Sequence, residues 1–498
     1  MNIHEEYSNI FEIIGRLGHV IDGATVQSDT SDTIDVFNPT TSNVLATVPR
    51  GTQADVSVAV ASAKTAYETR WKRIPPRERS DILSKCAKMI AGHENLLAPL
   101  EAMDTGKPIS AARRDVRRAA DYFRYYAGIC EKVYGETVPK GKDYVCFSQI
   151  EPLGVVGHIT PWNVPLSTAA RGVAPSLACG NTVVIKPAEE APLSTLYLGQ
   201  LLLGAGLPPG VCNVVNGYGD AAGAALALHQ DVNHLTFTGS VETGKSVMSA
   251  AASHICSVTM ELGGKSPMIV LRDADLNTVV EDAFRQIVSN AGQICSAGMR
   301  LVVHESLRGK VVSALLERLQ EVEIGPWFDD PDMGPLISKK QVARVSSHVD
   351  AGRKRGRSIL CGGSEAKIRG YENGFFYQPT IIDDVPIDDP LSQEEIFGPV
   401  MIIQTFDNDE GAMEIANGTP YGLAAGLYGK DIDKVMALSR DIRAGQVFIN
   451  EYHSAGDTVP FGGFGQSGIG REKGLAAIAN YTAPKFVTVR IHREAAIQ

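Results

Sequence analysis

The arrangement of apolar and polar positions divides the chain into a mainly helical first part and a longer part in which strands and helices alternate. From residue 152 onward, short apolar runs are separated by helical stretches. This alternation is typical of βαβ units and a parallel sheet. We therefore predict an α/β fold, whose first sheet contains Val155–Ile159, Thr182–Ile185, Asn213–Val215, Leu235–Phe237 and Val258–Met260.

The second half of the chain repeats this α/β character without repeating the sequence. Helices are predicted over Leu307–Glu323 and Asp431–Ile442, with strands before and after them. The predicted strands are Pro267–Val270, Leu301–His304, Thr380–Ile382, Val400–Phe406, Leu423–Tyr428 and Val447–Asn450. This pattern indicates a second α/β domain.

The residues before 152 carry a different pattern. Short strands are predicted at Thr33–Phe37 and Val44–Val48, and Thr52 is a suitable N-cap for the helix that follows. Longer helical patterns cover Arg77–Asp104 and Ser110–Val133.

Two extended segments stand apart from both α/β regions. Residues 137–151 are polar with apolar residues at roughly alternate positions, and Tyr481–Ile491 alternates in the same way. A period of two is typical of a half-buried strand. We predict that both belong to a separate small sheet, in which the tail pairs with residues 137–151 or with another subunit.

Polar residues follow the predicted strands of the first sheet, at the ends where ligands bind in parallel sheets. They are Asn163, Lys186, Glu189 and Glu261. Asn163 is either a turn former or an oxyanion donor. Lys186 and Glu189 are either a surface ion pair or a pair that binds the two hydroxyls of a ribose. Glu261 alone indicates no more than an acid at a turn or helix start.

Glycine-rich turns need separate interpretation. Gly239 and Gly244 flank a helix start, where free N–H groups and the Ser240 hydroxyl could bind phosphate; a tight strand-to-helix turn is the alternative. The segment Gly463–Gly468 matches GxGxxG. Too little chain follows it for a βαβ unit with a ribose-binding acid, so we interpret it as a backbone turn.

One cysteine lies in a stretch suited to a nucleophile. Cys295 follows a predicted helix, Asn277–Val288, and lies between glycine-containing breaks in the segment Ser289–Gly298. Such a thiol has access and nearby N–H donors, although most free cysteines are buried small hydrophobes. The eight cysteines are scattered without zinc spacing, so no metal site is expected.

Charge and composition argue against several partners. The chain has 47 basic and 57 acidic residues, a net charge of −10 and no Lys/Arg cluster, which disfavours nucleic acid and anionic membranes. Its most apolar run, Leu196–Leu207, is too short to span a bilayer, and residues 1–20 lack a secretory signal. Scattered thiols fit a reducing compartment, so a cytoplasmic location is expected.

Together, these motifs resemble the NAD(P)-dependent aldehyde dehydrogenase superfamily from about residue 20 to about residue 490. The motifs are Pro161-Trp162-Asn163, Lys186-Pro187-Ala188-Glu189, Phe237-Thr238-Gly239-Ser240, Glu261-Leu262-Gly263-Gly264-Lys265-Ser266-Pro267, Gly292-Gln293-Ile294-Cys295, Glu395-Ile396-Phe397-Gly398-Pro399 and Pro460-Phe461-Gly462-Gly463. The resemblance implies a Rossmann-like parallel-sheet NAD-binding domain (1–129 and 152–261), a catalytic α/β domain (262–464) and a small bridging β element (130–151 and 478–498). That element implies a homodimer or homotetramer.

The resemblance also implies residue roles. Cys295 would attack the aldehyde, Asn163 and the Cys295 N–H would hold the oxyanion, and Glu261 would activate water to hydrolyse the thioester. A carboxylate at 261 favours hydrolysis over acyl transfer to coenzyme A. Glu189 favours NAD over NADP on charge grounds, although the family uses both. The cofactor-binding residues would be Ile159, Thr160, Trp162, Lys186, Glu189, Gly219, Gly239, Ser240, Gly244, Leu262, Glu395 and Phe397.

The expected substrate pocket contains Arg171, Ser289, His453 and Phe461. Many family members have an aromatic–lysine pair where this chain has Arg171-Gly172, and in some semialdehyde-oxidising relatives an arginine near this position binds the distal carboxylate. The alternative is that Arg171 points to solvent or pairs with an acid. A polar loop at 451–455 favours a polar or carboxylate-bearing aldehyde, and an aromatic aldehyde stays open.

Two other functions fit a reactive cysteine. A thiol esterase would use Cys295 without a cofactor, but the residues at 186, 189 and 240 favour a dinucleotide enzyme. A catalytically silent relative is disfavoured because every expected catalytic group is present.

Overall fold

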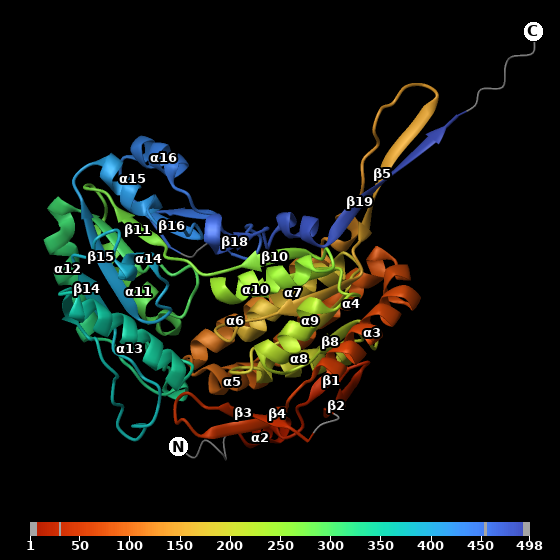
Figure 1. Ribbon diagram of the computed structural model, residues 1–498, viewed down its shortest axis with the longest axis horizontal. Coiled ribbons are helices and arrows are strands. Elements are labelled where there is room, and N and C mark those ends of the chain that lie inside the picture. The colour runs from red at the N-terminus through yellow and green to blue at the C-terminus, as the bar shows by residue number, and fades with distance from the viewer. Residues whose placement is uncertain (1–6, 29–30, 453–455, 492–498) are drawn as a thin grey trace, which may run out of the picture.

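The first of two large sheets supplies most of the strand ends predicted above. The computed structural model describes residues 7–28, 31–452 and 456–491 (Figure 1). The sheet has the order β18-β10-β9-β6-β7-β8-β1-β2, and its five central strands are parallel. These strands are β6 (Val155–Ile159), β7 (Thr182–Lys186), β8 (Cys212–Val214), β9 (His234–Thr238) and β10 (Ser257–Glu261). The predicted parallel sheet is confirmed at its centre.

The edges of this sheet are antiparallel, which the strand pattern did not predict. They are β1 (His19–Ile21) and β2 (Ala24–Val26) on one side, and the two-residue β18 (Gly468–Ile469) on the other. Because β18 pairs with β10, the C-terminal part of the chain reaches the strand that ends at Glu261.

The second sheet has the order β13-β14-β15-β12-β11-β16-β17 and is parallel except for its β13 edge. Its strands are β11 (Pro267–Val270), β12 (Arg300–His304), β13 (Ser358–Cys361), β14 (Thr380–Asp383), β15 (Val400–Phe406), β16 (Ala424–Tyr428) and β17 (Gln446–Ile449). Six of these were predicted; β13 was not. An α/β fold with two such sheets is therefore confirmed.

A two-stranded antiparallel sheet projects from the rest of the molecule (Figure 1). It joins β5 (Tyr144–Pro152) to β19 (Thr482–Arg490) over their full lengths. The predicted pairing between the tail and residues 137–151 is confirmed. A second small sheet pairs β3 (Thr33–Phe37) with β4 (Val44–Pro49).

Helices cover both large sheets. Thr52 caps α3 as predicted, in a reciprocal capping box with Asp55. The helical pattern predicted over Arg77–Asp104 is confirmed, and the structure divides it at His93 into α4 and α5. The helices are α2 (Ser8–Ile14), α3 (Gln53–Thr69), α4 (Pro76–Gly92), α5 (Glu94–Thr105), α6 (Ile109–Ala127), α7 (Pro165–Ala178), α8 (Leu193–Gly204), α9 (Ala224–Leu228), α10 (Val241–Ala252), α11 (Leu276–Val288), α12 (Glu305–Gln320), α13 (Lys339–Lys354), α14 (Pro390–Gln393), α15 (Asp409–Asn417) and α16 (Ile432–Asp441). Within the described ranges, none of them combines the length and apolar character needed to cross a membrane.

Candidate active site

The nucleophile loop, residues 289–296, follows the C-terminal end of α11 in an unusual backbone conformation. Asn290, Ala291 and Gly292 are consecutive residues with φ of 51°, 52° and 70°. The left-handed conformation costs a residue with a Cβ about 1–2 kcal/mol, so surrounding contacts must hold the loop. A Cβ on Gly292 would lie 2.3 Å from the Gly398 carbonyl oxygen, which requires glycine there.

Hydrogen bonds supply those contacts. Asn290 Nδ2 donates to the Asn163 carbonyl at 3.1 Å and to the Gln293 carbonyl at 3.2 Å. Gln293 Nε2 donates to the Asn290 carbonyl at 2.9 Å, and its Oε1 accepts from Ile337 N–H at 3.0 Å. These bonds tie the loop both to the segment that carries Asn163 and to the chain around residue 337.

Asn163 is buried and its amide has a fixed orientation. Its Oδ1 accepts from Val164 N–H at 3.1 Å, and one Nδ2–H donates to the Gln293 carbonyl at 2.8 Å. An amide nitrogen carries two donors, so the second is left for a ligand. Asn163 and Cys295 line one cavity of about 580 Å³, together with three further predicted residues: Arg171, Ser289 and Phe461.

The Cys295 thiol is partly buried at this cavity. Burial raises the pKa of Cys295 to about 12, and the charge of Arg171 opposes that shift. The Ser296 N–H also bonds the sulfur and lowers the pKa. The thiol is therefore protonated at neutral pH and needs a proton acceptor before it can attack.

Glu261 ends β10 and is buried. Neither carboxylate oxygen has a hydrogen-bond partner among the described residues. Burial raises the pKa of Glu261 well above its ordinary value, Glu472 raises it further, and Arg171 opposes both. Glu261 is not among the residues that line the large cavity, but its charge acts on the pKa of Cys295. The two groups are therefore close enough to interact, with Arg171 acting on both.

Arg171 is buried and does not point to solvent. It forms an ion pair with Glu472, and its Nη2 donates to Thr238 Oγ1 at 3.1 Å. Burial alone would lower the pKa of Arg171, but the Glu472 carboxylate raises it above its ordinary value. Of the alternatives stated for Arg171, the contacts match pairing with an acid.

The sequence reasoning missed Glu472. Phe461 and Glu472 form a β-bridge, which brings the segment after β18 next to the cavity. The signal was the charged run Arg471–Lys473 between two glycines, close to the predicted turn. That turn, at Gly465–Ser467, supports the catalytic region: Ser467 O accepts from Leu262 N–H at 3.0 Å.

The Lys186–Glu189 pair lies at the carboxyl end of β7, with Nζ and Oε2 2.8 Å apart. Burial would raise the pKa of Glu189, but the charge and hydrogen bond of Lys186 hold it below its ordinary value, and the Gly219 N–H adds to this. Glu189 is therefore an ionised acceptor, as a ribose diol needs. No atom lies within 4 Å of the open side of Gly219, which leaves room for a ligand.

The other predicted cofactor residues lie along the same strand ends. Ser240 caps α10 by accepting from Thr243 N–H, and a Cβ on Gly244 would lie 2.5 Å from Leu262. Ile159 ends β6, where Thr160 N–H donates to the Lys186 carbonyl at 3.0 Å. The five strand ends therefore present an amide, an ion pair and a helix N-terminus together, a donor set that fits a dinucleotide.

Two predicted residues approach from the second sheet. Phe397 has φ of 59°, and its ring packs edge-on against Trp162 with ring centroids 5.3 Å apart. Glu395 Oε1 accepts from Gly264 N–H at 3.1 Å, and burial raises the pKa of Glu395 to about 7. A Cβ on Gly263 would lie 2.3 Å from the same carboxylate. These contacts connect the segment after Glu261 to Glu395.

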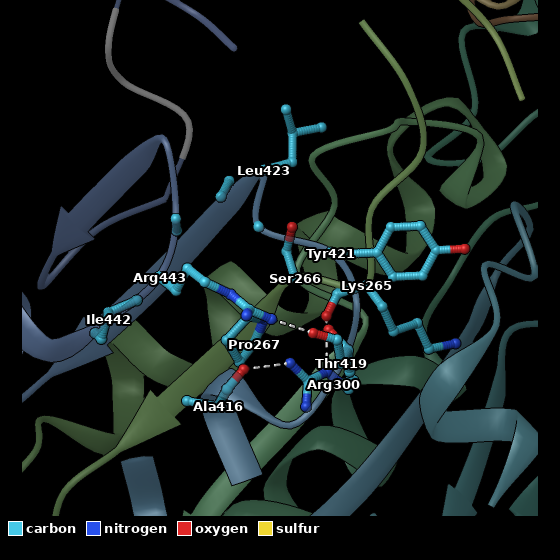
Figure 2. Close-up of a pocket in the computed structure, with 13 residues that line it drawn as sticks. Lys265, Ser266, Pro267, Arg300, Ala416, Thr419, Tyr421, Leu423, Ile442 and Arg443 are labelled. Atoms are coloured by element: carbon cyan, nitrogen blue, oxygen red, sulfur yellow. Dashed lines mark hydrogen bonds between the residues drawn. The ribbon is translucent and has the colours of Figure 1, made fainter. Parts of the chain in front are cut away.

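A small pocket of about 10 Å³ lies behind this segment (Figure 2). The buried Arg300 guanidinium donates to the carbonyls of Lys265, Ile415 and Ala416 at 2.7–2.8 Å. The pocket holds at most one water molecule, and its arginine ties the backbone at Lys265 to the end of α15.

His453 lies outside the described residues. Within the described part of the chain, no group of three or more His, Cys, Asp or Glu side chains could hold a metal ion.

Comparisons with known proteins show what the chain is similar to. A model of the aldehyde dehydrogenase family matches residues 25–487. The chain is 41% identical to an aldehyde dehydrogenase of Aspergillus niger over 477 residues, 95% of each chain. Retinaldehyde dehydrogenase 3 of Mus musculus is 42% identical over 92% of this chain and 90% of its own. The structure of an NAD+ complex of an aldehyde dehydrogenase from Bacillus cereus is similar, with a TM-score of 0.95, 41% identity and 99% of each chain covered.

Proposed function

Because the chain belongs to the aldehyde dehydrogenase family, we propose that it oxidises an aldehyde to the carboxylic acid with NAD, using Cys295 as its nucleophile. The observation that carries this assignment is that Cys295 and Asn163 line one cavity, with an amide N–H left for a ligand. A thiolate suits both halves of the reaction, since it attacks a carbonyl readily and leaves readily from a thioester.

The first half of the reaction forms a covalent adduct. The Cys295 sulfur attacks the aldehyde carbon and gives its proton to a base, and the resulting oxyanion accepts from Asn163 Nδ2 and the Cys295 N–H. Bound NAD would supply the hydride acceptor, and a thioester on Cys295 remains.

Glu261 acts in the second half of the reaction, the hydrolysis of the thioester. Its raised pKa makes the ionised carboxylate a stronger base, and this base takes a proton from water as the water attacks the thioester. The acid product then leaves, and the Cys295 thiol is restored. Hydrolysis, rather than acyl transfer to coenzyme A, is the proposed ending.

The cofactor would be held at the strand ends. Lys186 and Glu189 would bind the adenine ribose, Trp162 and Ser240 the pyrophosphate, and Glu395 with Phe397 the nicotinamide ribose. The ionised Glu189 favours NAD over NADP, because a 2′-phosphate would be repelled. Ile159, Thr160, Gly219, Gly239, Gly244 and Leu262 would complete the site.

The finer assignments are proposals as well. We propose the division into an NAD-binding domain (1–129 and 152–261), a catalytic domain (262–464) and an oligomerisation element (130–151 and 478–498). We also propose a cytoplasmic homodimer or homotetramer, which light scattering of the purified protein would test. The exposed apolar side chains of β5 and β19, including Val145, Phe486 and Val489, support an interface there.

The test of the function is absorbance at the wavelength of NADH when purified protein is mixed with NAD and a panel of polar, aliphatic and aromatic aldehydes. NADH formation with at least one aldehyde is expected. Hydrolysis of p-nitrophenyl esters without any NADH formation would favour the cofactor-independent thiol esterase. No reaction in either assay would favour a catalytically silent relative.

A further inference from the structure

The wall of the large cavity carries an excess of cationic side chains. Among the described residues that line it, the charged ones are Lys107, Arg114, Arg118, Arg171 and Lys473, against Asp115, Asp330 and Asp332. The question for substrate recognition is which of these charges are already balanced by protein groups.

Two of the cations are balanced. Lys107 Nζ lies 2.6 Å from Asp115 Oδ2 and 3.2 Å from Glu101 Oε1, fully buried. Arg171 is paired with Glu472. Because Glu472 already neutralises Arg171, Arg171 is poorly placed to bind a substrate carboxylate.

The other three cations share a single paired carboxylate, that of Asp457, among the described residues. We call these cations, Arg114, Arg118 and Lys473, the cationic wall. Arg118 Nε lies 3.7 Å from Asp457 Oδ1, with its side chain 48% exposed. Neither Arg114 nor Lys473 has a carboxylate oxygen within 4 Å in the described part of the chain. Two acids that line the cavity accept hydrogen bonds from backbone N–H groups: Asp330 from Ser110 N–H, and Asp332 from Glu323 N–H.

Helix α6 carries two pairs of arginines on different faces. Four of its five arginines, at 113, 114, 117 and 118, form two pairs spaced by four residues, so each pair lies on one face. Arg113 and Arg117 both pair with Glu94, at 3.3 and 2.8 Å. Arg114 and Arg118 line the cavity instead. Each pair of arginines has one carboxylate partner, Glu94 for the first and Asp457 for the second, and only the second pair lines the cavity.

Lys473 is held at the same wall by its backbone and an aromatic ring. Its φ is 61°, and its Nζ lies 5.0 Å from the centroid of the Phe461 ring. The pKa of Lys473 is lowered to about 8, chiefly by burial; the charges of Arg171 and Arg118 add to this shift, and those of Asp457 and Glu472 oppose it. An anion at this position would relieve that repulsion.

We propose that the substrate is an aldehyde with a distal carboxylate, and that Lys473 and Arg118 bind that carboxylate while the aldehyde carbon faces Cys295. This inference rests on the proposed function and names its substrate class. Lys473 and Arg118 together carry two positive charges and Asp457 offsets one of them, so a ligand with one negative charge balances this pair better than a ligand with two. That favours a carboxylate over a phosphate.

The experiment compares 4-oxobutanoate with butanal, which have equal chain lengths and differ in the distal carboxylate. We expect a higher kcat/KM for 4-oxobutanoate. Lys473→Met and Arg118→Met should each lower that kcat/KM about ten- to a hundredfold, mainly through KM, and leave butanal within about twofold. Lys473→Arg should retain most of the preference. Arg117→Gln is the matched control on the face of α6 that does not line the cavity, and it should change kcat/KM for neither substrate.

Several outcomes would overturn the inference. The inference is wrong if the wild-type protein shows no preference for 4-oxobutanoate, or if the two methionine variants lose activity equally on both aldehydes. A second pair of substrates, glyceraldehyde 3-phosphate and glyceraldehyde, tests for a phosphate in the same way. If the kcat/KM ratio of this pair exceeds that of 4-oxobutanoate to butanal, the wall recognises a phosphate and not a carboxylate. Calorimetry with the product acids separates this inference from the proposed function: succinate should bind more tightly than butyrate even without turnover, and equal binding would refute anion recognition.

Discussion

The nucleophile loop and the cationic wall line the same cavity but are built in different ways. The loop depends on backbone: three left-handed residues, a glycine pressed against a carbonyl, and hydrogen bonds from Asn290 and Gln293. The wall depends on side chains that extend from a regular helix and from Lys473.

Because of this difference, we expect the loop to determine the rate of reaction and the wall to determine which aldehydes are preferred. A residue in the loop cannot be exchanged without moving its neighbours, because each left-handed position is held by several contacts at once. A residue in the wall can be exchanged with little effect on the backbone. Variants of the loop should therefore affect every aldehyde, whereas variants of the wall should affect only charged ones.

The largest effect is expected at the nucleophile itself. Cys295→Ala should lower turnover at least about a thousandfold for every aldehyde, because no other group in the cavity can form the thioester. NAD binding, measured by fluorescence quenching or calorimetry, should survive. Cys256→Ala is the control, since that thiol does not line the cavity. Turnover retained by the Cys295 variant would discard the nucleophile assignment.

Glu261→Gln should separate the two halves of the reaction. General-base catalysis contributes about 10²–10⁴-fold, so steady-state turnover should fall by at least about a hundredfold while the first turnover still releases NADH. Stopped-flow absorbance should show a burst close to one NADH per site. In the unaltered protein, the steady-state rate should rise with pH through the raised pKa of Glu261, because the base acts when ionised. Loss of the burst would contradict a role confined to hydrolysis.

Gly292→Ala tests the loop without touching a reacting atom. The added Cβ would meet the Gly398 carbonyl at 2.3 Å, and a displacement of the sulfur by about 1 Å costs about a hundredfold in rate. We expect about that loss with neutral and anionic aldehydes alike. Gly309→Ala on α12, where nothing lies within 4 Å, should be neutral. Unequal losses of rate with neutral and anionic aldehydes would contradict the expectation that loop variants affect every aldehyde.

Much of the fold could be predicted from the sequence because strands buried on both faces leave uninterrupted apolar runs. The strands β6, β11 and β15 match the predicted residues completely. The antiparallel edges could not be found in this way, since β1, β2 and β18 are two or three residues long and carry no period. The sequence did not indicate the break at His93, because the helical pattern of α4 runs on into that of α5.

The site was predictable where a residue directly follows a strand or lies between glycines, as Asn163, Lys186 and Cys295 do. Glu472 and Lys473 were missed because they reach the cavity through a β-bridge between segments that are not regular elements. Arg118 was missed for another reason: four closely spaced arginines on a helix resemble a solvated face, and the sequence does not show that Arg114 and Arg118 line the cavity.

The smallest expected effect concerns pH and the cationic wall. Lys473 faces Arg171, Arg118, Asp457 and Glu472, and its pKa is lowered to about 8, chiefly by burial. It is cationic below that pH and neutral above it, while the guanidinium groups stay charged.

The ratio of kcat/KM for 4-oxobutanoate to kcat/KM for butanal cancels ionisations that both substrates share, such as those of Cys295 and Glu261. Because kcat/KM reports the pKa of the free enzyme, this ratio should fall up to about tenfold as pH rises from about 7 to about 9. In Lys473→Met the ratio should be low and independent of pH. A ratio that stays constant in the unaltered protein would mean that Lys473 does not contact the substrate carboxylate, and the selectivity of the wall would then depend on its arginines alone.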